Sequence, residues 1–242
     1  MKRNRLRTLF GWAILALSLA AARPLYSQEA ANPGPSVRFA ADIEAFLKED
    51  AVHPPPERGI LFVGSSIFRQ WKSLAEDMAP LPVFNRAFGG SRTEEVLYYM
   101  DRIVLPYRPR IIVYYCGSND INASLAPEGI FGRFRTFAER VARALPETRL
   151  FYVSINRAPQ KKNRWAQVDQ VNAMVREYCE GTDRVDFIDV NPVLFDGEGN
   201  PRMELYLSDR LHFQGQAYRE FTRVIRPVLE NSWQELRPKG DF

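Results

Sequence analysis

Residues 111–120 read Ile-Ile-Val-Tyr-Tyr-Cys-Gly-Ser-Asn-Asp, an apolar run that stops abruptly at turn-forming residues. The run does not alternate between apolar and polar side chains, which is typical of a strand buried on both faces of a sheet. Glycine, serine, asparagine and aspartate all favour turns. We therefore expect a central strand over residues 111–116, followed at once by a turn.

Similar apolar runs occur on both sides of this strand, and segments with helical periodicity separate them. Strands are predicted at residues 60–63, 82–84, 111–116, 150–155 and 185–190. Helices are predicted at residues 93–100, 128–145, 165–179 and 214–229, after a first helix that carries Phe39, Ile43, Phe46 and Leu47 and ends before His53. Alternating strands and helices predict an α/β fold in which helices cover both faces of a parallel sheet. We find no internal repeat and no sign of a second domain.

The N-terminal region differs in composition from the rest of the chain. Lys2, Arg3, Arg5 and Arg7 precede an apolar stretch over residues 9–22, which is typical of a signal peptide. The stretch has fourteen residues, whereas a membrane-spanning helix needs about 20. We expect a signal peptide over residues 1–27, a linker over 28–35 and one domain over 36–242. These segments predict a secreted or periplasmic protein without stable membrane insertion, and an uncleaved anchor stays open as the alternative.

Charge and cysteine content narrow the function classes. The formal net charge is +4, and the four basic residues ahead of the apolar stretch account for it. The mature chain is then near neutral and has no basic stripe that would indicate nucleic-acid binding. Cys116 and Cys179 are expected as buried free thiols, although pairing in an oxidising compartment stays open. With two cysteines and two histidines at unclustered positions, and no G-x-G-x-x-G pattern, neither a metal site nor a nucleotide cofactor is predicted.

Only two histidines, His53 and His212, are available as a general base. A serine nucleophile needs such a base, because its hydroxyl hardly ionises at neutral pH. His53 lies in a proline-rich loop without a suitably spaced carboxylate before it, whereas Asp209 precedes His212 by three residues. One turn can therefore carry both a base and the carboxylate that orients it. The alternative is a surface Asp–His pair that caps the last helix.

The other candidate groups directly follow predicted strands. Residues 60–66 read Ile-Leu-Phe-Val-Gly-Ser-Ser, a strand that enters a tight turn at Ser66, although a plain helix cap has the same pattern. Gly90 has two interpretations: it presents its backbone N–H to a substrate, or it is part of an ordinary loop. Asn119 donates its amide to an oxyanion, or it is part of a turn. Ligands of open parallel sheets bind beyond the carboxyl ends of the strands, so we expect these segments to meet.

Taken in this order, the segments resemble the SGNH hydrolases, also called the GDSL esterase/lipase superfamily, from about residue 59 to residue 229. The pattern around the serine and Gly90 is similar to the branch of platelet-activating-factor acetylhydrolase-like esterases. The resemblance implies a three-layer α/β/α, flavodoxin-like fold with five parallel strands. It also implies a catalytic Ser66, Asp209 and His212, and an oxyanion hole formed by Ser66, Gly90 and Asn119.

One position departs from the family pattern. The usual G-D-S reads Gly-Ser-Ser here, with Ser65 in place of the aspartate. That aspartate is not the triad acid, so we expect activity to survive. Ser65 is the second candidate nucleophile after Ser66.

The resemblance implies an extracytoplasmic serine esterase that needs no cofactor. Its substrates would be small-acyl carboxylic esters, such as acetyl esters of carbohydrates or simple lipids, hydrolysed through an acyl-enzyme on Ser66. The short chain has no long insertion for an elaborate lid. Arg157, Arg164 and Trp165 are candidates for substrate contact, although solvated charges and a packed tryptophan are the simpler interpretation.

Two other function classes stay open at this point. An acyltransferase would form the same acyl-enzyme and pass the acyl group to a sugar hydroxyl instead of water. A non-catalytic carbohydrate- or lipid-binding protein would use the same scaffold without chemistry. Retention of serine, asparagine, aspartate and histidine in register argues against the non-catalytic protein.

Overall fold

The computed structural model describes residues 38–236. The predicted signal peptide (1–27) and linker (28–35) lie outside the described residues. Every element named below belongs to the described part of the chain.

A single sheet of five parallel strands forms the centre, in the order β2-β1-β3-β4-β5. The strands are β1 (Ile60–Gly64), β2 (Val83–Asn85), β3 (Ile111–Tyr115), β4 (Arg149–Val153) and β5 (Val185–Ile188). Each predicted strand agrees with the observed one to within two residues at either end. After β2 the chain crosses back past β1 to β3, so the strand order reverses between β1 and β3.

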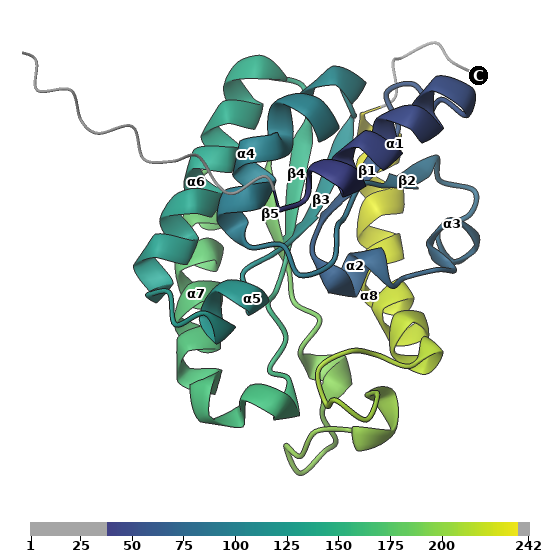
Figure 1. Ribbon diagram of the computed structural model, residues 1–242. Coiled ribbons are helices and arrows are strands. Elements are labelled where there is room, and N and C mark those ends of the chain that lie inside the picture. The colour runs from purple at the N-terminus through teal and green to yellow at the C-terminus, as the bar shows by residue number, and fades with distance from the viewer. Residues whose placement is uncertain (1–37, 237–242) are drawn as a thin grey trace, which may run out of the picture. The chain divides into compact units, whose positions relative to one another are not determined.

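Helices cover both faces of this sheet (Figure 1). On one face pack α1 (Ala40–Val52), α4 (Thr93–Ile103), α6 (Pro127–Ala144) and α7 (Trp165–Glu180). On the other pack α8 (Gly215–Glu235) and the short helices α2 (Ser66–Arg69) and α3 (Leu74–Asp77). The three-layer α/β/α fold predicted for the chain is therefore confirmed.

The central strand β3 separates two apolar clusters. Ile112 and Tyr114 belong to the cluster under α4 and α6, whereas Val113 and Tyr115 belong to the cluster under α8. These side chains are at most 1% exposed. Burial of apolar surface stabilises a fold by roughly 25 cal/mol per Å², and β3 contributes on both faces. This double burial explains why its sequence does not alternate.

Short helical segments account for most of the differences from the predicted elements. The sequence did not predict α2, α3 or α5 (Ser118–Asn122), nor the 3₁₀ turns η1 (Leu105–Tyr107), η2 (Pro159–Arg164), η3 (Pro192–Leu194) and η4 (Met203–Leu205). A segment of three to six residues contains too little of a helical repeat to show periodicity. The four long predicted helices are all present, and α8 extends beyond its predicted end to Glu235.

Both cysteines are free thiols in this structure. Cys116 directly follows β3 and is fully buried, while Cys179 near the end of α7 is partly buried. Burial raises the pKa of both thiols, to about 12 for Cys179. Neither thiol is therefore ionised at neutral pH, as a cysteine nucleophile would have to be.

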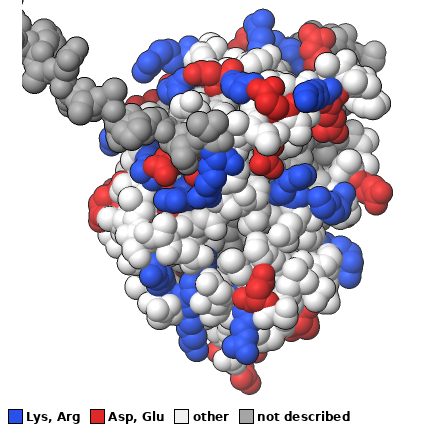
Figure 2. All heavy atoms as spheres, in the orientation of Figure 1, with Lys and Arg blue, Asp and Glu red and all other residues white. Residues whose placement is uncertain are grey.

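The surface carries charges of both signs. On the face shown in Figure 2, basic and acidic side chains are interspersed. Ion pairs such as Arg102–Glu44 (2.6 Å) and Arg140–Asp101 (2.7 Å) join neighbouring helices. Within residues 38–236, no helix combines the length and the apolar character that crossing a membrane requires.

Candidate active site

The candidate segments meet at the carboxyl ends of β1 and β3, where the strand order reverses. Gly64 ends β1 with a φ of +142°, and a Cβ there would lie 1.8 Å from the carbonyl oxygen of Tyr115 on β3. Gly117 follows β3 with a φ of +122°, and a Cβ there would lie 2.6 Å from Cδ1 of Ile155. Glycine at both positions lets the backbone turn out of the sheet at the carboxyl ends of the two strands, the edge at which open parallel sheets bind ligands.

Ser66 is the first residue of α2, directly after the turn at Gly64. Ser65 has an extended backbone (φ −109°, ψ −160°), and its side chain does not cap the helix. The Ser65 hydroxyl is buried and has no hydrogen-bond partner among the described residues. Ser66, in contrast, is partly exposed. Of the two candidate nucleophiles, only Ser66 has a hydroxyl that a substrate can reach.

The candidate base lies in a small hairpin between η4 and α8. Tyr206 and Phe213 form an isolated antiparallel bridge at its base. The N–H of Leu207 donates to the carbonyl of His212 at 2.8 Å, which closes the turn between them. The hairpin thus presents His212 at the rim of the sheet before the chain enters α8.

Asp209 shapes the tip of this hairpin. Its Oδ1 accepts the backbone N–H groups of Leu211 and His212, each at 2.9 Å. The helix α8 begins only at Gly215, with Gln214 at its N-cap position. Asp209 therefore orders the turn around His212 and does not cap the last helix, which was the alternative that the sequence left open.

Serine, histidine and aspartate form a continuous hydrogen-bonded chain. Nε2 of His212 lies 2.9 Å from Oγ of Ser66, and Nδ1 of His212 lies 2.6 Å from Oδ2 of Asp209. Burial acts to raise the pKa of Asp209, but hydrogen bonds from the His212 ring and from the backbone outweigh it and lower this pKa to about 2. An ionised Asp209 favours the tautomer with a proton on Nδ1 and leaves Nε2 free to accept the Ser66 proton.

Two backbone N–H groups near the serine are available to a ligand. Gly90 lies in the loop after β2 with a φ of +79°, and its carbonyl accepts Nη2 of Arg38 at 2.7 Å, which anchors the loop. Among residues 38–236, neither the N–H of Gly90 nor that of Ser66 has an acceptor. Unpaired N–H groups at a strand–helix junction are suitable donors for an oxyanion.

Asn119, in the first turn of α5, joins the loops after β3 and β2. Its Nδ2 donates to the carbonyl of Ser91 at 2.9 Å. A primary amide carries two protons, so the second remains for a ligand. The side chain is partly exposed, unlike its neighbours Ser118 and Asp120.

Asp120 is a structural residue of this site to which the sequence assigned no role. It is fully buried, and its carboxylate accepts the backbone N–H (3.0 Å) and the hydroxyl (2.5 Å) of Thr93, the first residue of α4. Burial raises the pKa of Asp120, although these hydrogen bonds act in the opposite direction. The contact fixes α5 against α4 and thereby helps to hold Asn119. The only sequence signal for Asp120 was its place in the turn sequence Gly-Ser-Asn-Asp, which did not indicate a contact with Thr93.

The three candidates for substrate contact after β4 have partners within the protein. Arg157 pairs with Asp169 at 2.6 Å, Arg164 donates to the carbonyl of Ile121, and the indole of Trp165 donates to the carbonyl of Ala158 at 2.9 Å. These contacts account for the positions of the three side chains without a substrate. They agree with the interpretation of the segment as loop charges and a packed tryptophan.

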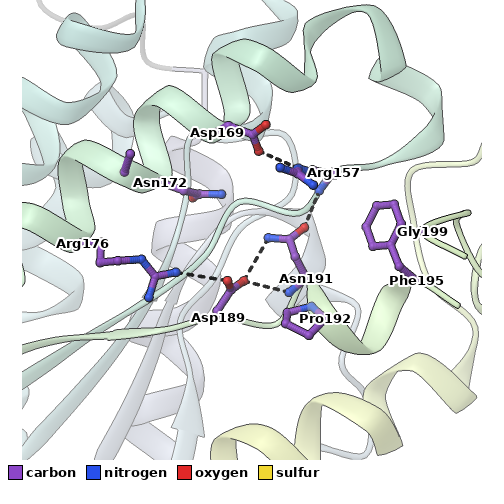
Figure 3. Close-up of a pocket in the computed structure, with 10 residues that line it drawn as sticks. Arg157, Asp169, Asn172, Arg176, Asp189, Asn191, Pro192, Phe195 and Gly199 are labelled. Carbon is purple, nitrogen blue, oxygen red and sulfur yellow. Dashed lines mark hydrogen bonds and ion pairs between the residues drawn. The ribbon is translucent and has the colours of Figure 1, made fainter. Parts of the chain in front are cut away.

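A cavity of about 450 Å³ lies beside α7 and the loop after β5 (Figure 3). Asp189 accepts hydrogen bonds from Asn191 and Arg176 there, and Arg157 reaches Asp169. None of the lining residues belongs to the Ser66–His212 chain, so this cavity is separate from the candidate catalytic groups. Neither here nor elsewhere within residues 38–236 do three or more potential metal ligands of the types His, Cys, Asp and Glu cluster.

The sequence also matches the profile of a known family, described as the GDSL-like lipase/acylhydrolase family, over residues 63–220. This match covers more than half of the 242 residues and includes both Ser66 and His212. The chain belongs to the GDSL-like lipase/acylhydrolase family. This GDSL-like acylhydrolase is therefore an enzyme of the esterase and lipase class, and the resemblance seen in its sequence is confirmed.

Solved structures share the fold of the GDSL-like acylhydrolase. A GDSL-like lipase from Bacteroides thetaiotaomicron VPI-5482 is 18% identical with a TM-score of 0.70, covering 79% of this chain and 98% of its own. A proposed platelet activating factor from Streptococcus pneumonia is 21% identical with a TM-score of 0.70, covering 80% and 94%. A carbohydrate esterase family 3 structure from Talaromyces cellulolyticus is 16% identical with a TM-score of 0.57, covering 73% and 98%. A search of the curated proteins finds no match.

Proposed function

We propose that this protein is an extracytoplasmic serine esterase that hydrolyses small-acyl carboxylic esters through an acyl-enzyme on Ser66. The observation that carries the proposal is the contact between Nε2 of His212 and Oγ of Ser66 at 2.9 Å, with Asp209 at 2.6 Å from the other ring nitrogen. A hydroxyl, an imidazole and an ionised carboxylate in this order are the elements of nucleophilic acyl transfer. Family membership supports the same reaction class.

The proposed reaction proceeds in two steps. His212 accepts the proton of Ser66 as Oγ attacks the ester carbonyl, and the N–H groups of Ser66 and Gly90 and the amide of Asn119 bind the oxyanion. The tetrahedral intermediate collapses when His212 returns the proton to the departing alcohol, which leaves the acyl group on Oγ. Water then gives a proton to His212 and attacks the acyl-enzyme; the bond to Oγ breaks as His212 returns that proton to Ser66, and the carboxylic acid is released.

The proposed substrates are acetyl esters of carbohydrates or simple lipids. The catalytic groups lie at the rim of the sheet, where the side chain of Asp209 is 47% exposed and that of His212 is 21% exposed. An open rim suits an ester on the edge of a larger alcohol better than a long acyl chain, which needs an enclosed apolar pocket. The fold shared with a carbohydrate esterase family 3 structure is consistent with this substrate class.

We further propose that residues 1–27 are a signal peptide and 28–35 a linker, and that 36–242 form the hydrolase domain outside the cytoplasm. The basic residues ahead of the apolar stretch 9–22 support this organisation. The N-terminal residue of the protein recovered from the host is the direct measurement. A chain that keeps Met1 and stays in the cytoplasm would contradict export.

Labelling with a fluorophosphonate probe, followed by peptide mapping, tests the enzyme class and the nucleophile together. We expect one covalent adduct on Ser66, and no adduct in Ser66→Ala. Ser65→Ala is the matched control: it removes the neighbouring hydroxyl, which has no partner among the described residues, and should label normally. An adduct on Ser65 would reassign the nucleophile, and a folded chain that neither labels nor hydrolyses p-nitrophenyl acetate would contradict the proposed function. Labelled acetyl recovered on an added sugar instead of as acetate would favour the acyltransferase.

A further inference from the structure

Lys161, in η2 between β4 and α7, is a buried lysine that the reaction described above does not use. Only 1% of it is exposed. Its Nζ donates to Oγ of Ser118 at 2.5 Å and to the carbonyl oxygen of Ser118 at 3.2 Å. Ser118 directly precedes Asn119. The ammonium group is therefore hydrogen-bonded to the residue next to Asn119, whose side-chain amide is the proposed oxyanion donor.

Burial of the Lys161 ammonium group costs free energy, which its contacts with Ser118 must offset. Lysine is almost never fully buried without an opposite charge, and Lys161 forms no ion pair with any residue in the described range 38–236. Burial lowers its pKa to about 8, and the nearby Arg164 acts in the same direction. At neutral pH the amine therefore still carries its proton in most molecules, and hydrogen bonds to Ser118 are its compensation.

The segment η2 also contacts the other half of the candidate site. The backbone N–H of Gln160 donates to the carbonyl of Arg210 at 3.1 Å, within the hairpin tip between Asp209 and His212. Arg164, at the end of η2, donates to the carbonyl of Ile121 at the other end of α5. One short segment thus connects α5, which carries Asn119, with the turn that carries the base.

We propose that Lys161 is a positioning residue of the oxyanion hole, which holds Ser118 and thereby aims the amide of Asn119 at the carbonyl oxygen of the substrate. The proposal rests on the esterase function proposed above. Lys161 does not touch the substrate in this scheme. It acts through Ser118, whose side chain and backbone oxygen it binds at once, so that the first turn of α5 cannot rotate without breaking both hydrogen bonds.

Kinetics of Lys161→Met test this role, because methionine keeps most of the length of the side chain and removes the donor. A small misplacement of a catalytic group can cost up to about 100-fold, and we expect kcat for p-nitrophenyl acetate to fall about 10- to 100-fold. KM should stay within about two-fold, because ground-state binding is not affected. The matched control is Lys162→Met, which alters the exposed neighbouring lysine on the same segment and should leave kcat unchanged.

A double-mutant cycle with Asn119→Ala separates positioning from a general structural effect. Asn119→Ala alone should lower kcat by about 10²–10³. If Lys161 acts through Asn119, adding Lys161→Met to Asn119→Ala should change kcat by no more than about two-fold. A full, additive loss in the double variant would overturn the proposal.

Hydrogen–deuterium exchange supplies a readout that needs no activity. Lys161→Met should accelerate exchange of the amides in residues 118–123 and leave those of α6 unchanged; unchanged exchange in 118–123 would overturn the proposal even if the wild-type chain proves to be no esterase. If Lys161→Met does not fold, Ser118→Ala removes the shorter of the two hydrogen bonds, to Oγ, and leaves the one to the carbonyl oxygen. It should lower kcat in the same direction, and wild-type kcat in Ser118→Ala would contradict the role.

Discussion

Ser66 and His212 are 146 positions apart in the chain, yet their reactive atoms lie within hydrogen-bonding distance. The two carboxylate oxygens of Asp209 have different partners. Oδ1 binds the backbone of the turn, and Oδ2 faces Nδ1 of the His212 ring. The same carboxylate therefore orders the main chain and selects the tautomer of the base.

Asp209→Asn should separate the ordering of the turn from the selection of the His212 tautomer. Asparagine can keep the backbone hydrogen bonds through its carbonyl oxygen, but it presents an amide N–H to Nδ1 and so favours the opposite tautomer. We expect kcat for p-nitrophenyl acetate to fall by about 10³–10⁴ at nearly unchanged melting temperature. Asp196→Asn, at an exposed turn aspartate that also accepts backbone N–H groups, is the control. Retention of a tenth or more of wild-type turnover would mean that another group orients His212.

At this scale the sequence predicted candidate residues that the structure brings together, and it missed those that hold them in place. Ser66, Gly90, Asn119, Asp209 and His212 all belong to motifs with a known spacing. Asp120 and Lys161 act through burial, which depends on which helices pack together. Lys161 belongs to the polar run Pro-Gln-Lys-Lys-Asn-Arg over residues 159–164, whose composition is that of a solvated loop. No local signal marks the one lysine in that run that turns inward.

At the scale of elements, the pairing of β1 with β3 determines where the proposed nucleophile, Ser66, lies. The register aligns Gly64 with Tyr115 at the last step of the ladder. Only a residue without a Cβ permits this approach, because the added atom would meet a backbone carbonyl that cannot move aside. The strands themselves were predictable from their apolar runs, whereas the order of strands was implied by the family resemblance and not by periodicity.

Gly64→Ala should therefore destabilise the sheet at its centre. We expect the free energy of unfolding, measured with urea, to fall by at least about 2 kcal/mol, because both the positive φ and the contact with Tyr115 oppose a side chain. Gly132→Ala provides the matched comparison: that glycine lies inside α6 with nothing within 4 Å of the added Cβ. It should stabilise the protein by about 0.5–1 kcal/mol. Equal effects at the two positions would contradict this account of the turn.

At the scale of the whole described domain, the candidate catalytic groups lie at the carboxyl edge of the sheet, among loops that hydrogen bonds anchor. Arg38 holds the Gly90 loop, Thr93 holds α5 through Asp120, and η2 holds both α5 and the hairpin. The triad side chains are accessible without any movement of these loops. The candidate site is thus preorganised and accessible, which is consistent with the small ester substrates proposed above.

An open site predicts the absence of interfacial activation. The rate with p-nitrophenyl butyrate should rise hyperbolically with concentration and pass the solubility limit of the ester without a jump. A lid-bearing lipase assayed in the same emulsion serves as the positive control. A sharp increase at the onset of emulsion would show that a segment covers the candidate site in solution, and it would shift the proposed substrate class toward aggregated lipid.

The antiparallel bridge between Tyr206 and Phe213 makes the hairpin of Asp209 and His212 a small unit of its own, which η2 contacts at its tip and which leads directly into α8. The proposed nucleophile, Ser66, follows the first strand, whereas the proposed base, His212, precedes the last helix. Turnover therefore reports on the docking of the C-terminal segment, while far-ultraviolet ellipticity reports on the sheet and its larger helices. In a sample that is gradually warmed, catalysis and secondary structure need not disappear at the same temperature, and loss of catalysis first would show that the hairpin detaches from Ser66 before the helices unfold.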